Sequence, residues 1–358
     1  MNRTAELPSV VTAVESYVHR ASVETFDALV TDAFAHQYET IEPYRRLCDQ
    51  RGVTPAGAIA WQHVPWVPVT AFRSLALHAG APRETFRSSG TTGGEAVRSV
   101  HHHPYPDLYR ATIDASFPSA VFAGLLRPDV LSLVTPRGLS HESSLGFMID
   151  HVIRRHAGAG SLEALGERGV EAAKARSWLG AHQRAGQPVA VLTTGFALVE
   201  LLDALERLGV RFRLPPGSVV METGGLKGRT REISRSDLLE RIEGFLAVPR
   251  QRVVREYGMT ELTSQFYTGA LAGEDAEFFR TAPWTRVRAL DPESLQPVAD
   301  GAPGLLAIFD LANLGSALHV LTQDLGVVEG DGFRLLGRLA GAEPRGCSLA
   351  VEEMLGRN

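Results

Sequence analysis

The stretch VAVLTTGFALVELLDALERLG, residues 189–209, carries the two hydrophobic patterns that decide the fold. VAVLTT at 189–194 is short, apolar and rich in β-branched residues, which predicts a buried strand. FALVELLDALERLG at 196–209 has apolar residues at helical spacing and predicts a helix. SVVMETGG at 218–225 then predicts a second strand. Strands that alternate with helices indicate βαβ units and a largely parallel sheet, so we expect an α/β fold.

The alternation continues on both sides of this stretch. Before it, VLSLVTP at 130–136 predicts a strand and residues 169–186 predict a helix. After it, Ser234 to Asp237 resembles a capping box that opens another helix, and VVREY at 253–257 predicts a strand. Residues 1–50 are helical in pattern and the last third is rich in strands. With no internal repeat or low-complexity linker, we expect one large domain over 1–336 and a hinge with a short tail over 337–358.

Composition excludes several classes of protein. The net charge is −5 and no basic block occurs, which argues against a nucleic-acid binder. No apolar run is long enough for a membrane span and no leader pattern is evident, so a cytoplasmic protein is expected. The two cysteines, Cys48 and Cys347, are too few for a disulfide framework or a Cys-rich zinc site. Cys48 follows a helical run and is interpreted as a buried hydrophobe.

The loop FRSSGTTGGEAVRS, residues 86–99, is the first candidate ligand site. Glycines let its backbone bend close to an anion, while hydroxyls and N–H groups can meet phosphate oxygens. No Lys follows the last Gly, so it is not a Walker A motif, and it lacks the Rossmann spacing. An ordinary Ser/Thr/Gly loop is the alternative. The candidate residues are Ser88, Ser89, Gly90, Thr91, Thr92 and Gly93.

A second glycine-rich turn, METGGLKGRTRE at 221–232, follows a predicted strand. Ligands of parallel sheets gather beyond the carboxyl ends of the strands. Lys is found only at Lys174 and Lys227, while Arg supplies the rest of the positive charge. A retained Lys can be needed for its compact ammonium. Lys174 fits a solvated helix face, whereas Lys227 in this turn is a candidate for binding a phosphorylated ligand.

Three further positions are open to two interpretations. Glu261 follows a predicted strand and could hold Mg²⁺, or could simply be solvated. The run of three histidines at 101–103 is adjacent in sequence and followed by Pro104, which disfavours a metal site. His141 and Ser144 lie where a helix begins and could meet an anion, although Ser143 or Ser144 could serve only as an N-cap.

Four motifs together resemble one enzyme superfamily. FRSSGTTGG, REYGMTE, LTQDLG and LLGRL resemble, in order and spacing, the signatures of adenylate-forming enzymes. More narrowly, METGGLKGRTRE, YGMTELTSQFY and RGCSLAVEEML are similar to the bacterial luciferase-associated acyl-protein synthetases, a family related to phenylacetate–CoA ligases. The resemblance covers roughly residues 24–355. It implies the large N-terminal domain of adenylate-forming enzymes, with layered sheets, helices and a β-rich distal part, and a C-terminal domain reduced to a short tail.

The resemblance also implies an activity and residue roles. ATP and a carboxylic acid, here a fatty acid, would give acyl-AMP and pyrophosphate, with Mg²⁺ as the metal. A C-terminal cysteine of the family takes the acyl group as a thioester, and an acyl reductase or acyl-carrier protein receives it. The implied roles are the phosphate loop for Ser88 to Gly93, the adenine turn for Gly224, Gly225 and Tyr257, Mg²⁺ binding for Glu261, ribose binding for Asp324, nucleotide contact for Arg338 and acyl transfer for Cys347.

The residues around Cys347 agree with that role. Arg345 is a nearby cation, and a cation favours the nucleophilic thiolate. Gly346 could let the tail move. The alternative is a buried structural cysteine.

Two departures from the family pattern concern positive charge. The phosphate loop lacks the terminal Pro-Lys, and the short tail lacks the catalytic Lys of a full C-terminal domain. We therefore expect Lys227, assisted by Arg98 or Arg231, to stabilise the departing pyrophosphate.

Two other functions stay open at this point. One is an acyl-CoA or amide ligase that uses the same adenylate without a protein thioester. The other is a non-catalytic nucleotide-binding subunit. In an acyl-protein synthetase or in such a ligase, the pocket for the acid would be lined by residues 139–148 and 265–267.

Overall fold

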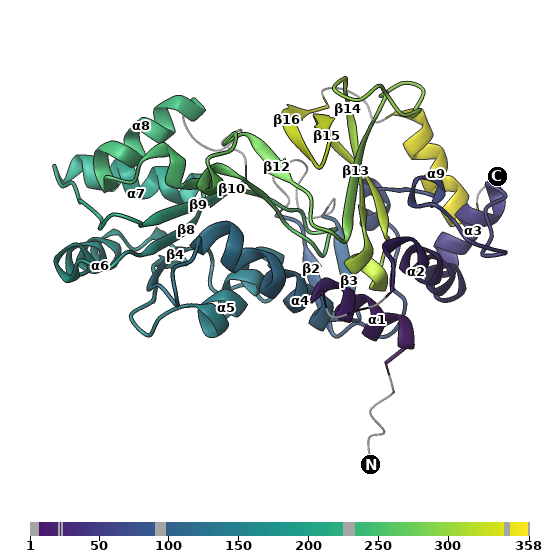
Figure 1. Cartoon of the computed structure of the whole chain (residues 1–358), viewed down its shortest axis with the longest axis horizontal. Coiled ribbons are helices and arrows are strands. Elements are labelled where there is room, and N and C mark those ends of the chain that lie inside the picture. The colour runs from purple at the N-terminus through teal and green to yellow at the C-terminus, as the bar shows by residue number, and fades with distance from the viewer. Residues whose placement is uncertain are drawn as a thin grey trace, which may run out of the picture. The chain divides into compact units, whose positions relative to one another are not determined.

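The computed structural model describes residues 7–20, 22, 24–89, 98–224, 233–339 and 344–356 (Figure 1). Within these ranges no helix is long and apolar enough to cross a membrane. The chain divides into two compact units. The first unit comprises Met1–Ala115, Met259–Ser264 and Thr281–Asn358; the second comprises Ser116–Gly258 and Gln265–Arg280.

The second unit is built on the predicted parallel sheet. Its strands run in the order β12-β11-β10-β9-β8-β4-β5, and β10, β9, β8, β4 and β5 are mutually parallel. Strands β11 and β12 extend the sheet in antiparallel fashion. Its strands are β4 (Val130–Leu133), β5 (Leu162–Glu163), β6 (Leu165–Gly166), β7 (Gly169–Val170), β8 (Ala190–Thr194), β9 (Val219–Thr223), β10 (Val253–Tyr257), β11 (Phe266–Thr268) and β12 (Phe278–Arg280). The α/β prediction is confirmed.

Helices cover this sheet because its central strands are apolar on both faces, as parallel strands usually are. All five residues of β9 are buried, and residues of α6, α7 and α8 share one apolar core with the strands (Figure 1). Thr194, Ser143 and Ser234 cap α7, α5 and α8 by accepting backbone N–H bonds; the capping box predicted at Ser234 is confirmed, and of the two serines considered before α5 the cap is Ser143. The helices are η4 (Pro118–Phe122), α5 (Ser144–His156), α6 (Ala172–Ala185), α7 (Gly195–Arg207), α8 (Arg235–Leu246), η5 (Arg250–Arg252) and η6 (Ala270–Ala272).

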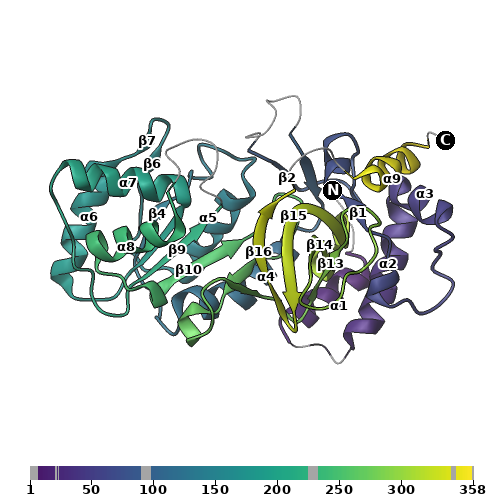
Figure 2. The same cartoon turned by 90° about the horizontal axis from the view of Figure 1, so that it is seen from above.

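The first unit carries an antiparallel sheet in the order β13-β14-β15-β16, with β1 parallel to β15 (Figure 2). A separate hairpin pairs β2 with β3. Its strands are β1 (Val67–Pro68), β2 (Glu84–Arg87), β3 (Val100–His103), β13 (Thr285–Leu290), β14 (Pro303–Asp310), β15 (His319–Glu329) and β16 (Gly332–Arg338). Its helices are α1 (Ser9–Val18), α2 (Phe26–Thr40), α3 (Glu42–Gln50), η1 (Trp61–His63), η2 (Val69–Arg73), η7 (Leu311–Gly315) and α9 (Arg345–Leu355), and α4 (Pro106–Phe117) begins in it.

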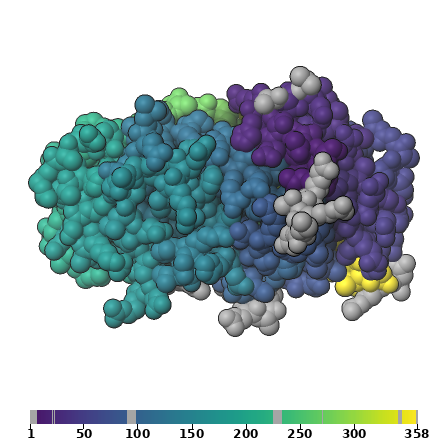
Figure 3. Space-filling model, turned by 90° about the horizontal axis from the view of Figure 1, so that it is seen from below, coloured from purple at the N-terminus to yellow at the C-terminus, as the bar shows by residue number. Residues whose placement is uncertain are grey.

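The chain after β16 forms a helix that is docked on the first unit. Helix α9 packs against α3, and Figure 3 shows its residues in yellow against the purple and blue of the N-terminal helices. Arg51, which caps the C-terminus of α3, forms an ion pair with Glu353 at 3.3 Å and also stacks over Trp66. A β-carbon at Gly346 would lie 2.5 Å from Cδ1 of Leu295. Gly346 therefore permits close packing at this position, rather than a freely moving tail.

Candidate functional site

Two predicted site residues face each other across paired strands of the first unit. Asp324 on β15 lies directly opposite Arg338 on β16, and their charged groups are 3.7 Å apart. Gly337, just before Arg338, has φ of 142°, a backbone conformation that residues other than glycine rarely adopt. The Arg338 side chain is 55% exposed. The guanidinium of Arg338 is therefore accessible at the surface of the first unit, whereas the Asp324 side chain is 22% exposed.

Glu261 is buried in the loop that joins β10 to β11. Only 5% of the residue is exposed, which is unusual for a carboxylate. Burial raises the pKa of its carboxyl, while a hydrogen bond from Ser99 and the charges of Arg338 and Arg73 oppose that rise. The charge of Arg338 thus acts on both Glu261 and Asp324. The structure brings these three predicted residues into one electrostatic site.

The predicted phosphate loop joins β2 to β3 and starts beside Glu261. Ser88 and Ser99 pair at its base: Ser99 N donates to Ser88 Oγ at 2.9 Å, and Ser88 N donates to Ser99 O at 3.0 Å. Arg98 donates to the carbonyl of Ser88, and Ser89 is exposed. Buried Ser99 therefore links the two: its backbone pairs with Ser88 at the base of the loop, and its side chain bonds Glu261.

The remaining loop residues lie outside the described part of the chain. These are Gly90, Thr91, Thr92 and Gly93 of the phosphate loop, and Gly225, Lys227 and Arg231 of the second turn. Their predicted roles stay predictions.

Tyr257 and Gly224 belong to the second unit, at the carboxyl ends of the parallel strands β10 and β9. Tyr257 is buried against Phe266 and Phe279. Gly224 has φ of 81° and open space at its β-carbon position. An exposed glycine at the carboxyl edge of the strands is where a ligand of a parallel sheet would lie.

A polar network that the sequence did not indicate surrounds these two strand ends. Glu222 on β9 is buried and meets Arg235 at 2.9 Å and Arg255 at 3.3 Å. Glu256 on β10 is also buried and accepts a hydrogen bond from the hydroxyl of Thr223. Burial is the main cause, with the charge of Glu222 as a second, that raises the pKa of Glu256 to about 7. A carboxyl group that titrates near neutrality therefore lies one residue before Tyr257.

Cys347 lies in the first turn of α9 and is only 4% exposed. It packs in an apolar cluster with Leu290, Leu305, Ala307 and Leu321. It is not in a disulfide. Cys48 is buried as predicted, and burial raises the pKa of its thiol to about 12, which makes it inert. In this arrangement the Cys347 sulfur is not open to an acyl group.

Comparisons with known proteins identify the family that these motifs resemble. A family model described as "Acyl-protein synthetase, LuxE" matches residues 179–356. A long-chain-fatty-acid–luciferin-component ligase of Aliivibrio fischeri is 23% identical over 94% of this chain and 90% of its own, and that of Vibrio harveyi is 21% identical over 91% and 86%. The predicted resemblance to the acyl-protein synthetases is confirmed.

Solved structures agree on the fold. A crystal structure of 2-hydroxyisobutyryl-CoA ligase in complex with 2-HIB-AMP and CoA has a TM-score of 0.65 and 16% identity, and covers 89% of this chain and 76% of that one. A postadenylation state of the same ligase has a TM-score of 0.64 and 16% identity, and covers 87% and 68%. The fold is therefore that of an adenylate-forming ligase, as the acyl-protein synthetase resemblance implied.

Sequence reasoning missed several polar residues near the motifs. Ser99 and Arg73 act on Glu261 but lie in other segments, and no short-range pattern connects them. The histidines at 101–103 do not act as a set: His101 and His103 are buried and hydrogen-bonded, and His102 is partly exposed.

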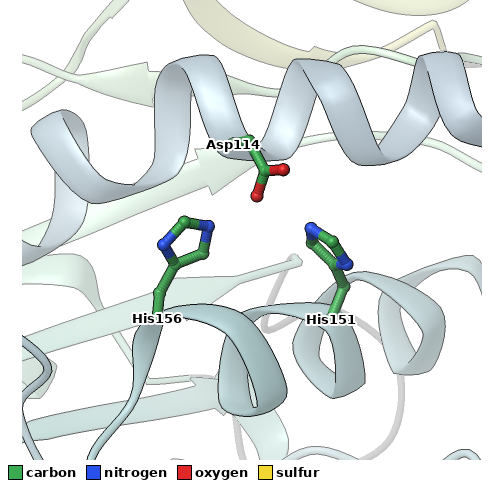
Figure 4. A group of neighbouring side chains, drawn as sticks. All are labelled: Asp114, His151 and His156. Carbon is green, nitrogen blue, oxygen red and sulfur yellow. The ribbon is translucent and has the colours of Figure 1, made fainter.

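Outside these motifs, α5 carries two more histidines. The rings of His151 and His156 are 6.1 Å apart, and Figure 4 shows them with Asp114 of α4. All three are of residue types that bind divalent metals. Asp114 falls in the first unit and the histidines in the second, and we assign no site to them.

Proposed function

We propose that this chain is an ATP-dependent acyl-activating ligase of the acyl-protein synthetase type, acting on a fatty acid. The observation that carries this proposal is the meeting of Glu261, Asp324 and Arg338 in one electrostatic site, with the base of the phosphate loop beside it. The names of the two relatives support a fatty acid as the substrate class.

The first step joins the acid to AMP. A carboxylate oxygen of the acid attacks the α-phosphorus of ATP, the bond to the β-phosphate oxygen breaks, and pyrophosphate leaves. Asp324 accepts hydrogen bonds from the ribose hydroxyls, and Arg338 binds the nucleotide. Such catalysis rests mainly on positioning and on charge stabilisation.

The surroundings of Glu261 fit a Mg²⁺ ion. Its carboxylate and the Ser99 hydroxyl are hard oxygen donors, and Mg²⁺ commonly takes one or two carboxylates together with substrate phosphates. When bound, the ion neutralises phosphate charge. Lys227, with Arg98 or Arg231, supplies further positive charge to pyrophosphate, and the structure adds Arg73 to the cations near Glu261.

The second step transfers the acyl group to Cys347. Its thiolate attacks the acyl carbon, the thiol proton passes to solvent, and AMP leaves as the thioester forms. Since Cys347 lies on the buried face of α9, this step requires the helix to leave its docked position. An acyl reductase or an acyl-carrier partner then takes the acyl group.

Acid-dependent exchange of pyrophosphate into ATP, measured over a panel of carboxylic acids, tests the first step. Intact-mass spectrometry after incubation with ATP and each acid tests the second. We expect Cys347→Ser to keep the exchange and to lose the covalent acyl group, while the matched control Cys48→Ser keeps both. Absence of exchange with every acid would refute the proposal. Full product formation by Cys347→Ser would point instead to an acyl-CoA or amide ligase.

A further inference from the structure

The loop that carries Glu261 is held by side chains from four other elements, β3, α4, β14 and η7. Five of its backbone polar groups are bound in this way. Thr260 O accepts from His101 Nδ1 at 2.7 Å, Glu261 O from Asn313 Nδ2 at 2.9 Å, and Thr263 O from Thr112 Oγ1 at 3.0 Å; the N–H groups of Thr263 and Ser264 donate to Asp310 Oδ2 at 3.0 and 2.8 Å.

The direction of each bond in this network follows from Asn313. Its amide nitrogen donates to the carbonyls of Glu261 and Ala317, so its amide oxygen is the acceptor for the Thr263 hydroxyl at 2.8 Å. The Thr263 oxygen must then accept from His103 Nε2, which lies 3.0 Å away. His103 Nδ1 is therefore a bare acceptor, which explains why it is buried without a partner.

His101 binds the backbone carbonyl that immediately precedes Glu261 in the chain. Its Nδ1–H donates to the carbonyl of the peptide that joins Thr260 to Glu261. The ring is 1% exposed and is fixed by Phe72, whose ring centroid is 5.8 Å away, and by His103 at 5.0 Å. Burial lowers the pKa of His101 to about 4, so the imidazole stays neutral near physiological pH.

We propose that His101 is a positioning residue for Glu261. Through the Thr260 carbonyl it fixes the peptide plane just before Glu261, and so the direction in which the carboxylate points toward its metal. This inference rests on the metal-binding role proposed for Glu261. Partners that orient a metal ligand from outside the coordination sphere commonly change metal affinity 10- to 100-fold when they are removed.

His319 provides a matched control for this role. It is also 1% exposed in the first unit, and its Nδ1 donates to a backbone carbonyl, that of Val64, at 2.9 Å. Both histidines contribute to folding through the same kind of bond. They differ in where the bond ends, because Val64 is outside the Glu261 loop.

The test is a Mg²⁺ titration of the full-length protein, followed by calorimetry for binding and, in parallel, by acid-dependent ATP–pyrophosphate exchange. His101→Leu removes the donor and should raise the half-saturating Mg²⁺ concentration about tenfold. His101→Asn places an amide N–H where Nδ1 was and should restore a requirement within about twofold of wild type. His319→Leu should destabilise the protein to a similar extent while leaving the Mg²⁺ requirement unchanged.

Two results would overturn the inference. One is a folded His101→Leu protein with the wild-type Mg²⁺ requirement, and the other is an equal shift in His101→Leu and His319→Leu. If His101→Leu does not fold, His101→Gln replaces it, because the Gln amide reaches the Nε2 position and not the Nδ1 position. A Mg²⁺ requirement of His101→Gln equal to that of His101→Asn would then contradict the proposal. Glu261→Gln separates this inference from the proposed function. An unchanged Mg²⁺ requirement in Glu261→Gln removes the metal-binding role itself, whereas a shift there without one in His101→Leu removes only the role of His101.

Discussion

The two units bury carboxylates in different ways. In the first unit, Asp310 has no exposed surface and accepts four hydrogen bonds, from the N–H groups of Thr263, Ser264 and Ala312 and from the Ser264 hydroxyl. In the second unit, Glu222 is flanked by the guanidinium groups of Arg235 and Arg255. Dipoles therefore surround one carboxylate, and full charges surround the other.

The two arrangements constrain their carboxylates differently. Dipoles fixed in the backbone orient a carboxylate without a long, mobile side chain, which favours a rigid loop beneath Glu261. Ion pairs between side chains hold charge but leave room for protonation. Burial of Glu256 beside the Glu222 charge raises its pKa to about 7, since Thr223 offers it only one hydroxyl. The first arrangement fixes geometry, and the second leaves one group free to titrate.

Among the changes that test this difference between the units, removal of the Asp310 carboxylate should have the largest effect on the free energy of unfolding. Asp310→Ala leaves two loop N–H groups, one helix-capping N–H and one hydroxyl without their acceptor, at roughly 1–3 kcal/mol for each unsatisfied buried group. We expect a loss of about 4 kcal/mol or more in the free energy of unfolding, measured by urea denaturation. Asp291→Ala is the control, because Asp291 accepts three hydrogen bonds in an exposed turn, and it should change the midpoint far less. Equal effects would show that burial of Asp310 adds nothing.

The fold was predictable because its signals are local. The strand and helix patterns of residues 189–223 lie within the windows that periodicity can resolve, and β8, α7 and β9 follow them. Glu261, Asp324 and Arg338 were predicted from motif resemblance, and the structure brings them together. What joins them was not predictable. Ser99, Arg73 and His101 act across long sequence separations, which periodicity and spacing do not encode.

The burial of Cys347 also depends on residues that are distant in the sequence. Its neighbours Arg345 and Gly346 favoured a reactive thiolate on a tail that can move, with a buried cysteine as the alternative. The segment forms α9, and the sulfur is buried with Leu290 and Leu321. The apolar residues that bury it come from β13, β14 and β15, far away in the sequence. Burial of a single residue depends on such partners, so the sequence could suggest a chemical role for Cys347 but not its accessibility.

Titration of Glu256 should have the next largest effect. Its pKa in the folded protein, about 7, lies above the ordinary value of 4.5 that applies to the unfolded chain. The unfolded state therefore binds fewer protons between these values, and the contribution of Glu256 to stability is lost as pH rises from 4.5 to 7. At about 1.4 kcal/mol per pH unit, wild type should lose roughly 3 kcal/mol more than Glu256→Gln across this range.

Calorimetric unfolding of both proteins from pH 4.5 to pH 8 measures this difference. Glu240→Gln, at an exposed position of the second unit, is the control and should follow the wild-type profile. Parallel profiles for wild type and Glu256→Gln would mean that Glu256 is already ionised throughout, and would remove the distinction drawn between the two units.

Removing Arg235, which forms ion pairs with both Glu222 and Glu277, should have the smallest effect. Loss of one partner from a buried pair commonly costs about 3–5 kcal/mol. Arg235→Met leaves Glu222 with Arg255 still 3.3 Å away, so we expect about 2 kcal/mol in urea denaturation. The control is Arg334→Met in the first unit, which breaks an ion pair with Glu329. The side chains of Arg334 and Glu329 are 36% and 51% exposed, so the loss should be less than about 0.5 kcal/mol. High salt should shrink the effect at Arg334 and leave most of that at Arg235, because buried pairs are screened less. If Arg235→Met costs no more than Arg334→Met, Arg255 alone neutralises Glu222, and the second unit needs no paired cations to bury its carboxylate.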